Sequence, residues 1–370
     1  MSRRPNGAIN KLSSIDRNDG RRNRLGRRKI GSGNTLTRIG VVGTGYWGKN
    51  LTRNFSELGA LAAICDSDTD ALNAIGEKYP AADRYADLAA LLAQPDIDAI
   101  VLSTPAETHG ALARQVLNAG KHVFVEKPLC LDPNEGRALK TLSETADKTL
   151  MVGHMLLYHP AFQALRKHVD AGEIGDIRYI YSTRLSLGQI RRTENALWSF
   201  APHDISMILS LTGKMPQRVV TNGAAYLQQN VADTTMSHFT FSETLQAHIF
   251  VSWLHPFKDH RLVVVGSDGM IVFDDVRTGP EKLLFYKHQV SVADELPTVN
   301  RAEGMPIEYA DEEPLRRECQ HFLDCIAQSR PPASDAAEGI RVLSVLDACQ
   351  ISLNSGTGVE LNHDEHNFYP

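Results

Sequence analysis

A glycine pattern between a predicted strand and a predicted helix constrains the fold of this chain more than any other feature. Gly43, Gly45 and Gly48 form a G-x-G-x-x-G pattern directly after the strand-like run Arg38 to Val42. The segment that follows carries large apolar residues at helical spacing, namely Trp47, Leu51, Phe55 and Leu58. In this context the first glycine permits a tight turn, the second lets a pyrophosphate approach the backbone, and the third lets helix and strand pack closely. The pattern predicts a dinucleotide-binding βαβ unit whose cofactor contacts are Gly43, Gly45, Tyr46, Trp47 and Gly48.

The residue after the second predicted strand distinguishes between the two nicotinamide dinucleotides. Asp66 follows Leu61 to Cys65, at the distance from the glycines where an acidic side chain binds the adenosine ribose hydroxyls. No Lys or Arg follows until Lys78, so a ribose 2′-phosphate would meet negative charge without a cationic partner. We therefore expect NAD rather than NADP, with Asp66 and Ser67 among the cofactor-binding residues.

The pattern of strand-like and helix-like segments changes near residue 154. Before it, short apolar strands alternate with amphipathic helices, which is typical of a parallel sheet covered by helices. These strands are predicted over Arg38 to Val42, Leu61 to Cys65, Ile100 to Leu102, His122 to Val125 and Leu150 to Val152, and a helix over Asn134 to Asp147. After it, longer strand-like runs such as Ile177 to Thr183 and Leu245 to Leu254 are joined by short connections, which favours an open, mostly antiparallel sheet.

We therefore predict an α/β protein of two folded domains. An NAD-binding Rossmann domain is expected over residues 38–153, and an α/β domain for substrate binding and oligomerisation over residues 154–370. The apolar periodicity of Leu315 to Leu353 predicts C-terminal helices that could pack back on the Rossmann domain. A broad, half-apolar sheet face favours self-association, as a homodimer or homotetramer.

Residues 1–37 differ in composition from the rest of the chain. They hold ten Lys and Arg residues against Asp16 and Asp19, with almost no large apolar side chains, so we expect a disordered basic arm. Such an arm could contact nucleic acid, but a solvated tail is the simpler interpretation, and the formal net charge of −5 does not favour nucleic acid or a membrane as partner. The arm lacks the apolar stretch of a secretory signal, and no run approaches the length that spans a bilayer.

The five cysteines are scattered, which favours reduced thiols in the cytoplasm and no metal site.

Two short motifs end neighbouring predicted strands. Ser103-Thr104-Pro105 follows one and Glu126-Lys127-Pro128 ends the next, so both lie at the carboxyl edge of the sheet, where ligands bind. Pro128 favours an extended conformation at Lys127, which suits this lysine to donate a proton or to stabilise a developing alkoxide. The residues expected to line the cofactor site here are Ser103, Thr104, Pro105, His109, Glu126 and Lys127.

The glycine loop, Ser-Thr-Pro and Glu-Lys-Pro in this order resemble the Gfo/Idh/MocA family of oxidoreductases, from Arg38 to the C-terminus. The resemblance implies a Rossmann domain followed by an open-sheet α/β domain, and oxidation or reduction of sugars or cyclitols. It also implies that Lys127 is catalytic and that a second-domain histidine, matched here by His203, completes the site. Many members carry an aspartate one turn before this histidine, where this chain has Ser199.

Local sequence independently supports a base at His203. Pro202 suits the first position of a helix, which would place His203 and Asp204 in the first turn. The helix dipole there disfavours imidazolium, and a neutral imidazole can accept a hydroxyl proton as hydride leaves the carbon.

Several stretches resemble one branch of the family, the nucleotide-sugar 3-dehydrogenases acting on UDP-N-acetylglucosamine or its uronic acid. They are Gly45 to Asn50, Gly153 to Pro160, Arg184 to Arg191, Trp198 to Asp204 and Trp253 to Lys258. The resemblance implies NAD-dependent oxidation of a sugar C3 hydroxyl to a 3-keto sugar. The expected substrate-binding residues are Tyr158, Arg184, Arg191, Asn195, Trp198, His203 and Asp204.

Two other functions remain open from the sequence. The same residues could serve a reductase of a nucleotide-linked deoxy-ketosugar in the reverse direction, using NADH or NADPH. Some members of the family are non-catalytic NAD-binding regulators, although retention of both Lys127 and His203 speaks against that reading. Some relatives reoxidise their bound nicotinamide with 2-oxoglutarate, and no residue of this chain indicates whether it does so.

Overall fold

The computed structural model describes residues 29–30, 34–188, 190–192, 194–293 and 296–361. The chain divides into two units, Met1–Leu36 and Thr37–Pro370. In the first unit, β1 (Lys29–Ile30) and β2 (Asn34–Thr35) form an antiparallel pair, which the expectation of a disordered arm does not include. Residues 1–28 and 31–33 of the expected arm lie outside the described part of the chain.

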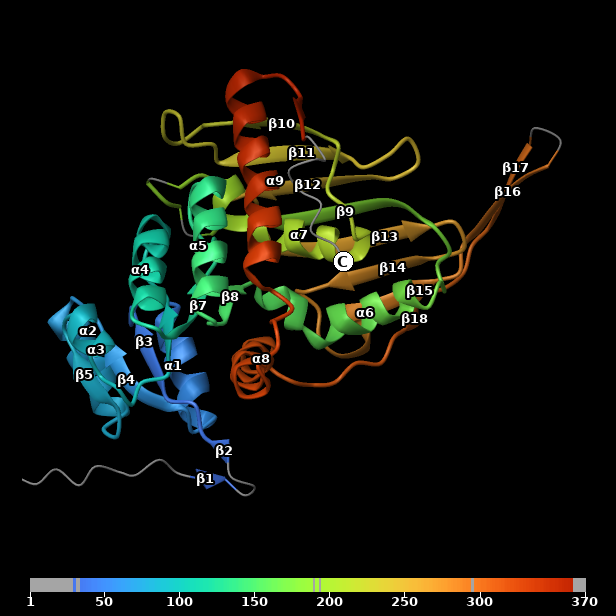
Figure 1. Ribbon diagram of the computed structural model, residues 1–370. Helices are drawn as coiled ribbons and strands as arrows, with labels where there is room; N and C mark the ends of the chain where they lie inside the picture. The colour runs from blue at the N-terminus through green and yellow to red at the C-terminus, as the bar shows by residue number, and fades with distance from the viewer. Residues whose placement is uncertain (1–28, 31–33, 189, 193, 294–295, 362–370) are drawn as a thin grey trace, which may run out of the picture. The chain divides into compact units, whose positions relative to one another are not determined.

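The second unit begins with a six-stranded parallel sheet in the order β5-β4-β3-β6-β7-β8 (Figure 1). This is the strand order of a doubly wound dinucleotide-binding fold, in which the order reverses between β3 and β6. Five strands lie where the sequence predicts them, and the short polar edge strand β5 is the one that the apolar pattern misses. The strands are β3 (Ile39–Val42), β4 (Leu61–Cys65), β5 (Asp83–Tyr85), β6 (Ala99–Leu102), β7 (His122–Glu126) and β8 (Leu150–Gly153). The helices between them are α1 (Gly48–Glu57), α2 (Thr69–Lys78), α3 (Leu88–Leu92), α4 (Ala106–Asn118) and α5 (Pro133–Thr145).

A second sheet of nine strands follows, in the order β18-β15-β14-β13-β9-β12-β11-β10-β19. Only β9 and β12 pair in parallel, and all other neighbours are antiparallel, as the sequence predicts. Its strands are β9 (Ile177–Leu185), β10 (Arg218–Ala224), β11 (Thr234–Thr240), β12 (Gln246–Ser252), β13 (Asp259–Gly266), β14 (Met270–Asp274), β15 (Leu283–Tyr286), β18 (Met305–Pro306) and β19 (Val359–Glu360). The associated helices are η1 (Met155–Tyr158), α6 (Pro160–Asp170), α7 (Ala196–Thr212), η2 (Gly279–Lys282), α8 (Pro314–Gln328) and α9 (Ala336–Ser355). In a separate hairpin, β16 (Gln289–Ala293) pairs with β17 (Leu296–Asn300).

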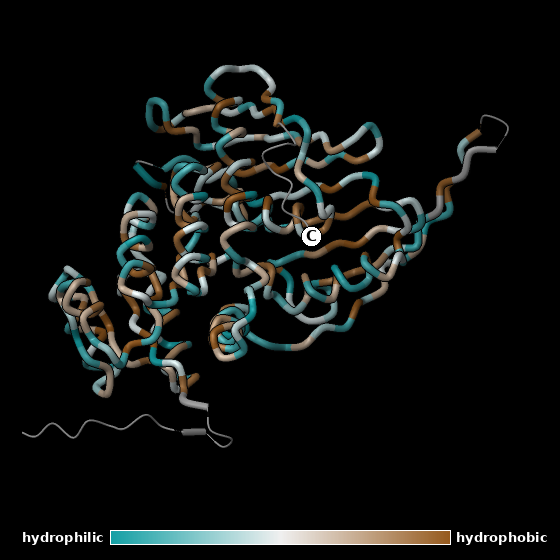
Figure 2. Tube along the Cα trace, viewed as in Figure 1, coloured by the Kyte–Doolittle hydropathy of each residue, from teal (hydrophilic) through white to brown (hydrophobic). Residues whose placement is uncertain are grey.

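The C-terminal helices pack against both sheets. Phe322 of α8 lies in one core with Val101 of β6 and Phe55 of α1, whereas Leu343 of α9 lies on the other face of the parallel sheet. Other residues of α9 belong to the core of the nine-stranded sheet, so this helix contributes to two cores at once. Hydrophobic positions recur along the strands of the nine-stranded sheet (Figure 2). Among the described residues, no helix combines the length and apolar character that crossing a membrane requires.

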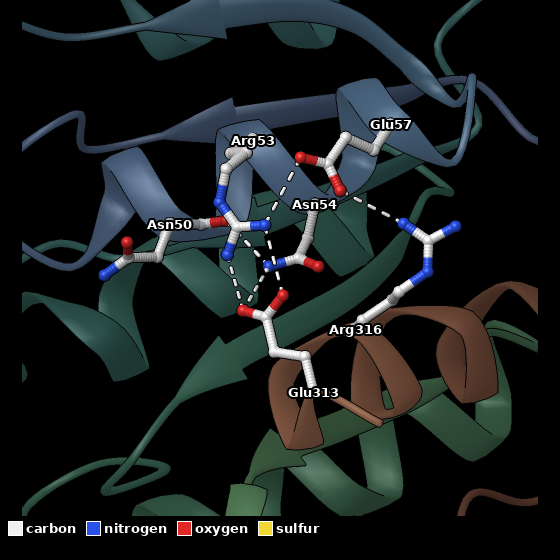
Figure 3. Close-up of polar contacts among 6 residues, drawn as sticks. All are labelled: Asn50, Arg53, Asn54, Glu57, Glu313 and Arg316. Carbon is white, nitrogen blue, oxygen red and sulfur yellow. Dashed lines mark hydrogen bonds and ion pairs between the residues drawn. The ribbon is translucent and has the colours of Figure 1, made fainter. Parts of the chain in front are cut away.

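A polar network joins α1 to α8. Figure 3 shows Arg53 and Glu57 of α1 facing Glu313 and Arg316 near the start of α8. The Arg53 guanidinium contacts both carboxylate oxygens of Glu313, at 2.5 and 3.1 Å, and Arg316 lies 3.1 Å from Glu57. The hydrogen bond from Arg53 lowers the pKa of Glu313. Because α1 begins in the glycine loop, this network fixes the helix on which a dinucleotide phosphate would rest.

We expect the Arg53–Glu313 pair to add a small amount to stability, because both side chains are partly exposed. A double-mutant cycle of Arg53→Met and Glu313→Gln should give a coupling of about 0.5–1 kcal/mol in the free energy of unfolding at neutral pH. The coupling should decrease as pH falls through the lowered pKa of Glu313, since protonation removes its charge. The Arg166–Asp170 pair within α6 is a matched control and should give a smaller value. Absence of coupling at Arg53 would show that the network does not stabilise the fold.

Candidate active site

The glycine loop has the geometry that close approach of a pyrophosphate requires. Gly43 has φ +86°, and a Cβ on it would lie 2.5 Å from the carbonyl oxygen of Ser103. A Cβ on Gly48 would lie 1.9 Å from the carbonyl oxygen of Gly43, so helix and loop pack too closely for a side chain. A Cβ on Gly45 would meet nothing within 4 Å, so this glycine faces open space. This arrangement fits a dinucleotide whose phosphates lie against Gly45 and the start of α1.

Asp66 follows β4 and is hydrogen-bonded to the glycine loop. Its Oδ2 accepts from the amide and the hydroxyl of Thr44, at 2.7 and 2.8 Å, and its Oδ1 accepts from the amide of Asp68 at 3.0 Å. Burial alone would raise the pKa of Asp66, but these hydrogen bonds outweigh burial and hold the pKa below its ordinary value. An ionised carboxylate therefore stands at the end of β4, beside the exposed Ser67. Sequence reasoning missed Thr44, which is fully buried and bonded to Asp66.

His109, which the sequence predicts at the cofactor site, is only 1% exposed. Its Nδ1 lies 2.7 Å from the carbonyl oxygen of Pro128, and its Nε2 lies 2.9 Å from that of Thr104. The imidazole therefore joins the turn after β6 to the turn after β7, and both of its nitrogens already contact backbone carbonyl oxygens. Ser103 and Thr104 themselves are partly exposed beside the glycine loop.

Glu126 and Lys127 bring the end of β7 into contact with two other elements. The indole N–H of Trp47, in the glycine loop, donates a hydrogen bond to Glu126 Oε1. Lys127 Nζ donates to the backbone carbonyl oxygen of Ser199 in α7 at 2.9 Å. Burial lowers the pKa of the Lys127 ammonium, and the carboxylates of Glu194 and Glu126 only partly offset this effect.

His203 lies near the middle of α7, so the predicted placement in a first turn is wrong. The helix begins earlier because Asn195 caps it, its Oδ1 accepting from the amide of Trp198 at 3.1 Å, and Pro202 lies inside the helix. The helix dipole therefore does not determine the protonation of His203. Burial lowers its pKa well below the ordinary value, and the positive charges of Lys127 and Arg184 add to the effect. The imidazole is neutral for this different reason, and its buried Nδ1 has no hydrogen-bond partner.

Two of the predicted substrate contacts are buried core groups. Asp204 is 0% exposed, and its oxygens accept from Arg184 Nε at 2.8 Å, Arg184 Nη2 at 3.1 Å and Ser182 Oγ at 2.6 Å. Tyr158 is 3% exposed, and its hydroxyl pairs with Ser334 Oγ at 2.8 Å. The polar atoms of both side chains are therefore hydrogen-bonded within the protein. Arg184 is 6% exposed and also lies 3.2 Å, through Nη1, from His260 Nδ1, so it acts mainly within the same buried network.

The other predicted substrate residues lie around the start of α7. Trp198 Nε1 and Asn195 Nδ2 both donate to Gln350 Oε1 of α9, at 3.0 and 2.8 Å. Gln350 was not predicted, because a contact between residues so distant in sequence leaves no local signal. Arg191 is exposed and pairs with Glu194 at 3.1 Å. Within the described ranges, no group of three or more metal-ligating side chains is placed to hold a metal ion.

Comparisons with known proteins agree with this architecture. Residues 37–154 match the family described as "Oxidoreductase family, NAD-binding Rossmann fold", and residues 162–272 match "GFO/IDH/MocA C-terminal domain". The chain is 28% identical over 313 residues to UDP-N-acetylglucosamine 3-dehydrogenase of Acidithiobacillus ferrooxidans, covering 83% of this chain and 94% of that protein. It is 34% identical over 204 residues to inositol 2-dehydrogenase of Rhizobium meliloti, covering 53% and 61% of the two chains.

Solved structures show the same fold. The crystallised UDP-N-acetylglucosamine 3-dehydrogenase of Acidithiobacillus ferrooxidans superposes with a TM-score of 0.76 at 26% identity, over 86% of this chain and 97% of that one. An oxidoreductase from Agrobacterium radiobacter in complex with NAD⁺, L-tartaric acid and magnesium superposes with a TM-score of 0.73, over 88% and 98%, and at 17% identity it shows the fold alone. Together with the loop geometry and the two family matches, these similarities identify the chain as an NAD-binding oxidoreductase that belongs to the Gfo/Idh/MocA family.

Proposed function

We propose that this oxidoreductase transfers a hydride from C3 of a UDP-linked N-acetylated sugar, or of its uronic acid, to NAD. The product is the 3-keto sugar. The observation that carries the proposal is the 2.9 Å hydrogen bond from Lys127 Nζ to the carbonyl oxygen of Ser199. It connects the lysine at the carboxyl edge of the Rossmann sheet to α7 one turn before His203, and the charge of Lys127 acts on His203. This supports assigning the two groups to one reaction, because both are suited to proton chemistry.

The two groups have different roles in this mechanism. NAD, when bound, supplies the hydride acceptor. His203 accepts the proton of the C3 hydroxyl, because burial and the neighbouring positive charges keep its imidazole neutral. Lys127 stabilises the developing alkoxide or relays the proton, and its lowered pKa brings the ammonium nearer to a value at which it exchanges protons. The position of Ser199 offers no carboxylate to His203, so no relay through that residue is part of the mechanism.

The choice of sugar is supported by similarity and by one exposed cation. The chain resembles UDP-N-acetylglucosamine 3-dehydrogenase over nearly the whole length of that protein. Arg191 is exposed in the segment before α7, where it could meet the diphosphate or a sugar carboxylate. Trp198 is half-buried close by and presents an aromatic ring.

A substrate panel tests the proposal. Purified protein is incubated with NAD and a set of UDP- and dTDP-sugars, with and without 2-oxoglutarate, and nicotinamide absorbance is followed. We expect absorbance to rise with a UDP-N-acetylated sugar or its uronic acid. In a parallel assay that contains NADH or NADPH, oxidation of the reduced cofactor by dTDP-ketosugars alone would instead identify a ketosugar reductase. Binding of NAD without turnover in either assay would indicate a regulator.

We propose that Asp66 selects NAD through the adenosine ribose and holds the glycine loop through Thr44. Asp66→Ser should raise the dissociation constant for NAD by about 10- to 100-fold, since hydrogen bonds to a charged group are lost. It should also reduce the preference for NAD over NADP. Asp68→Ser is the matched control, because the Asp68 side chain caps α2, where it accepts from the amides of Asp70 and Ala71. Equal NAD affinities in the wild type and Asp66→Ser, measured by calorimetry, would rule out this role.

We propose that the exposed face of the nine-stranded sheet associates with a second copy of the chain, as a homodimer or as part of a homotetramer. Tyr179 and Met236 are exposed on this face, and Tyr181 stacks on His248 with ring centroids 5.3 Å apart. Such a broad aromatic and apolar surface is typical of an interface. Light scattering should give a mass of two or four chains for the wild type and a smaller mass for Tyr179→Glu combined with Met236→Lys. A monomeric wild type would contradict the proposal.

A further inference from the structure

Glu126 contacts the cofactor loop and the backbone of Lys127 with the same carboxyl group. Its Oε1 accepts the indole N–H of Trp47, the residue directly before the first turn of α1. Its Oε2 accepts the backbone amide of Lys127 at 3.3 Å. One side chain therefore connects the segment that would hold the pyrophosphate to the residue that carries the proposed proton chemistry.

The surroundings of Glu126 are crowded with buried titratable groups. Besides Lys127, they include His154, directly after β8, and Glu318 and Cys319, from α8, which act electrostatically on Glu126 or respond to its charge. Glu318 is 0% exposed, and neither carboxyl oxygen has a hydrogen-bond partner. His154 Nδ1 lies 2.5 Å from Glu338 Oε2 of α9. The backbone at Gly153 also lies close to Glu126, since a Cβ on Gly153 would lie 3.0 Å from Glu126 Oε2.

This crowding determines which carboxyl groups hold protons. An ionised carboxylate without donors in a dry interior is very costly, so Glu318 stays neutral, and burial followed by the charges of Glu126 and Glu338 raises its pKa. Glu126 has two donors and an adjacent ammonium. Burial nevertheless raises the pKa of Glu126 to about 7, with Trp47 and Lys127 opposing the shift. Of these two carboxyl groups, Glu126 has hydrogen-bond donors that stabilise its charged form and Glu318 has none, so we expect Glu126 to be the one that changes charge.

We propose that Glu126 is a positioning residue whose carboxylate holds the cofactor loop, through Trp47, and the backbone of Lys127 in one arrangement. The proposal rests on the proposed function only in that Lys127 is taken as catalytic. A carboxylate accepts both hydrogen bonds, whereas a protonated carboxyl group carries a hydroxyl that competes with one of the two donors. Protonation of Glu126 therefore loosens either the loop or the lysine turn.

Indole fluorescence reports this contact without any sugar substrate. The chain has three tryptophans, and of these Trp253 is fully buried and Trp198 donates to Gln350. We expect an emission change with a midpoint near pH 7 in the wild type. It should be lost in Glu126→Gln and in Trp47→Phe, which leaves the carboxyl group in place. Glu318→Gln is the matched control and should keep the midpoint, because an amide there replaces a carboxyl group that already holds its proton.

Three further readouts separate a positioning role from a merely structural one. Glu126→Gln places an amide N–H against one of the two donors, Trp47 or Lys127. Hydrogen exchange at the glycine loop or at the end of β7 should therefore accelerate, and the dissociation constant for NAD should rise about tenfold. The acid limb of kcat against pH, with its midpoint near pH 7 in the wild type, should disappear in this variant. A fluorescence transition that is absent from the wild type or persists in Glu126→Gln or Trp47→Phe would overturn the proposal, as would unchanged exchange and NAD affinity. These binding and spectroscopic results stand even if the sugar assignment fails, so the two failures are distinguishable.

Discussion

Lys127→Met lowers kcat by about a thousandfold and leaves the dissociation constant for NAD within a few-fold of the wild-type value. The methionine keeps the apolar length of the side chain but removes the ammonium that faces the carbonyl oxygen of Ser199. Losing a preorganised charge at a developing alkoxide costs about 10²–10³ in rate, and losing a proton relay adds to that loss. The measurements are steady-state kinetics with the accepted UDP-sugar and calorimetric titration of NAD.

The control for this variant is Lys167→Ala, which removes an exposed lysine from the last turn of α6. It should leave kcat and NAD affinity unchanged. His203→Ala should resemble Lys127→Met, with turnover lost and NAD binding retained, because the imidazole lies in α7 rather than in the glycine loop. Unimpaired turnover in both Lys127→Met and His203→Ala would remove the basis for assigning these two residues to the active site.

Asp204→Ala lowers the free energy of unfolding by about 3–5 kcal/mol, because it leaves the Arg184 guanidinium buried without its counter-charge. The double variant Arg184→Met/Asp204→Ala should recover much of this loss, since an apolar side chain then replaces the unpaired charge. Chemical denaturation of the wild type and the three variants, including Arg184→Met alone, measures the coupling. A cost below about 1 kcal/mol for Asp204→Ala would show that water or another group compensates Arg184.

The parallel sheet was predictable because its signals are local. Each central strand is a short apolar run. The glycine loop needs glycine locally because Gly43 has a positive φ and Gly48 packs against the carbonyl oxygen of Gly43. The edge strand β5, Asp83–Tyr85, was missed because an edge position demands little apolar character. The start of α7 was misplaced because Pro202 resembles a helix start, whereas the cap is Asn195.

The sequence motifs predicted which residues belong to the candidate site, but not the contacts that these residues make. Lys127 and His203 follow from motif and family resemblance, but the cause of the neutral imidazole is burial and neighbouring charge, which depend on tertiary packing. The sequence could not show that Asp204 is buried against Arg184, because these residues meet only when β9 packs on α7. Glu318, on α8, likewise enters the surroundings of Glu126 only through the return of a C-terminal helix to the Rossmann sheet.

Deuterium transfer from a labelled substrate tests the proposed reaction at the level of a single carbon. A UDP-N-acetylated sugar that carries deuterium at C3 is incubated with the protein and NAD, and the reduced nicotinamide is analysed by mass spectrometry. We predict that one deuterium atom appears in NADH and that the rate falls with this label, but not with deuterium at C4 or C6. Transfer from C4 or C6, or NADH that contains no deuterium from C3, would contradict oxidation at C3.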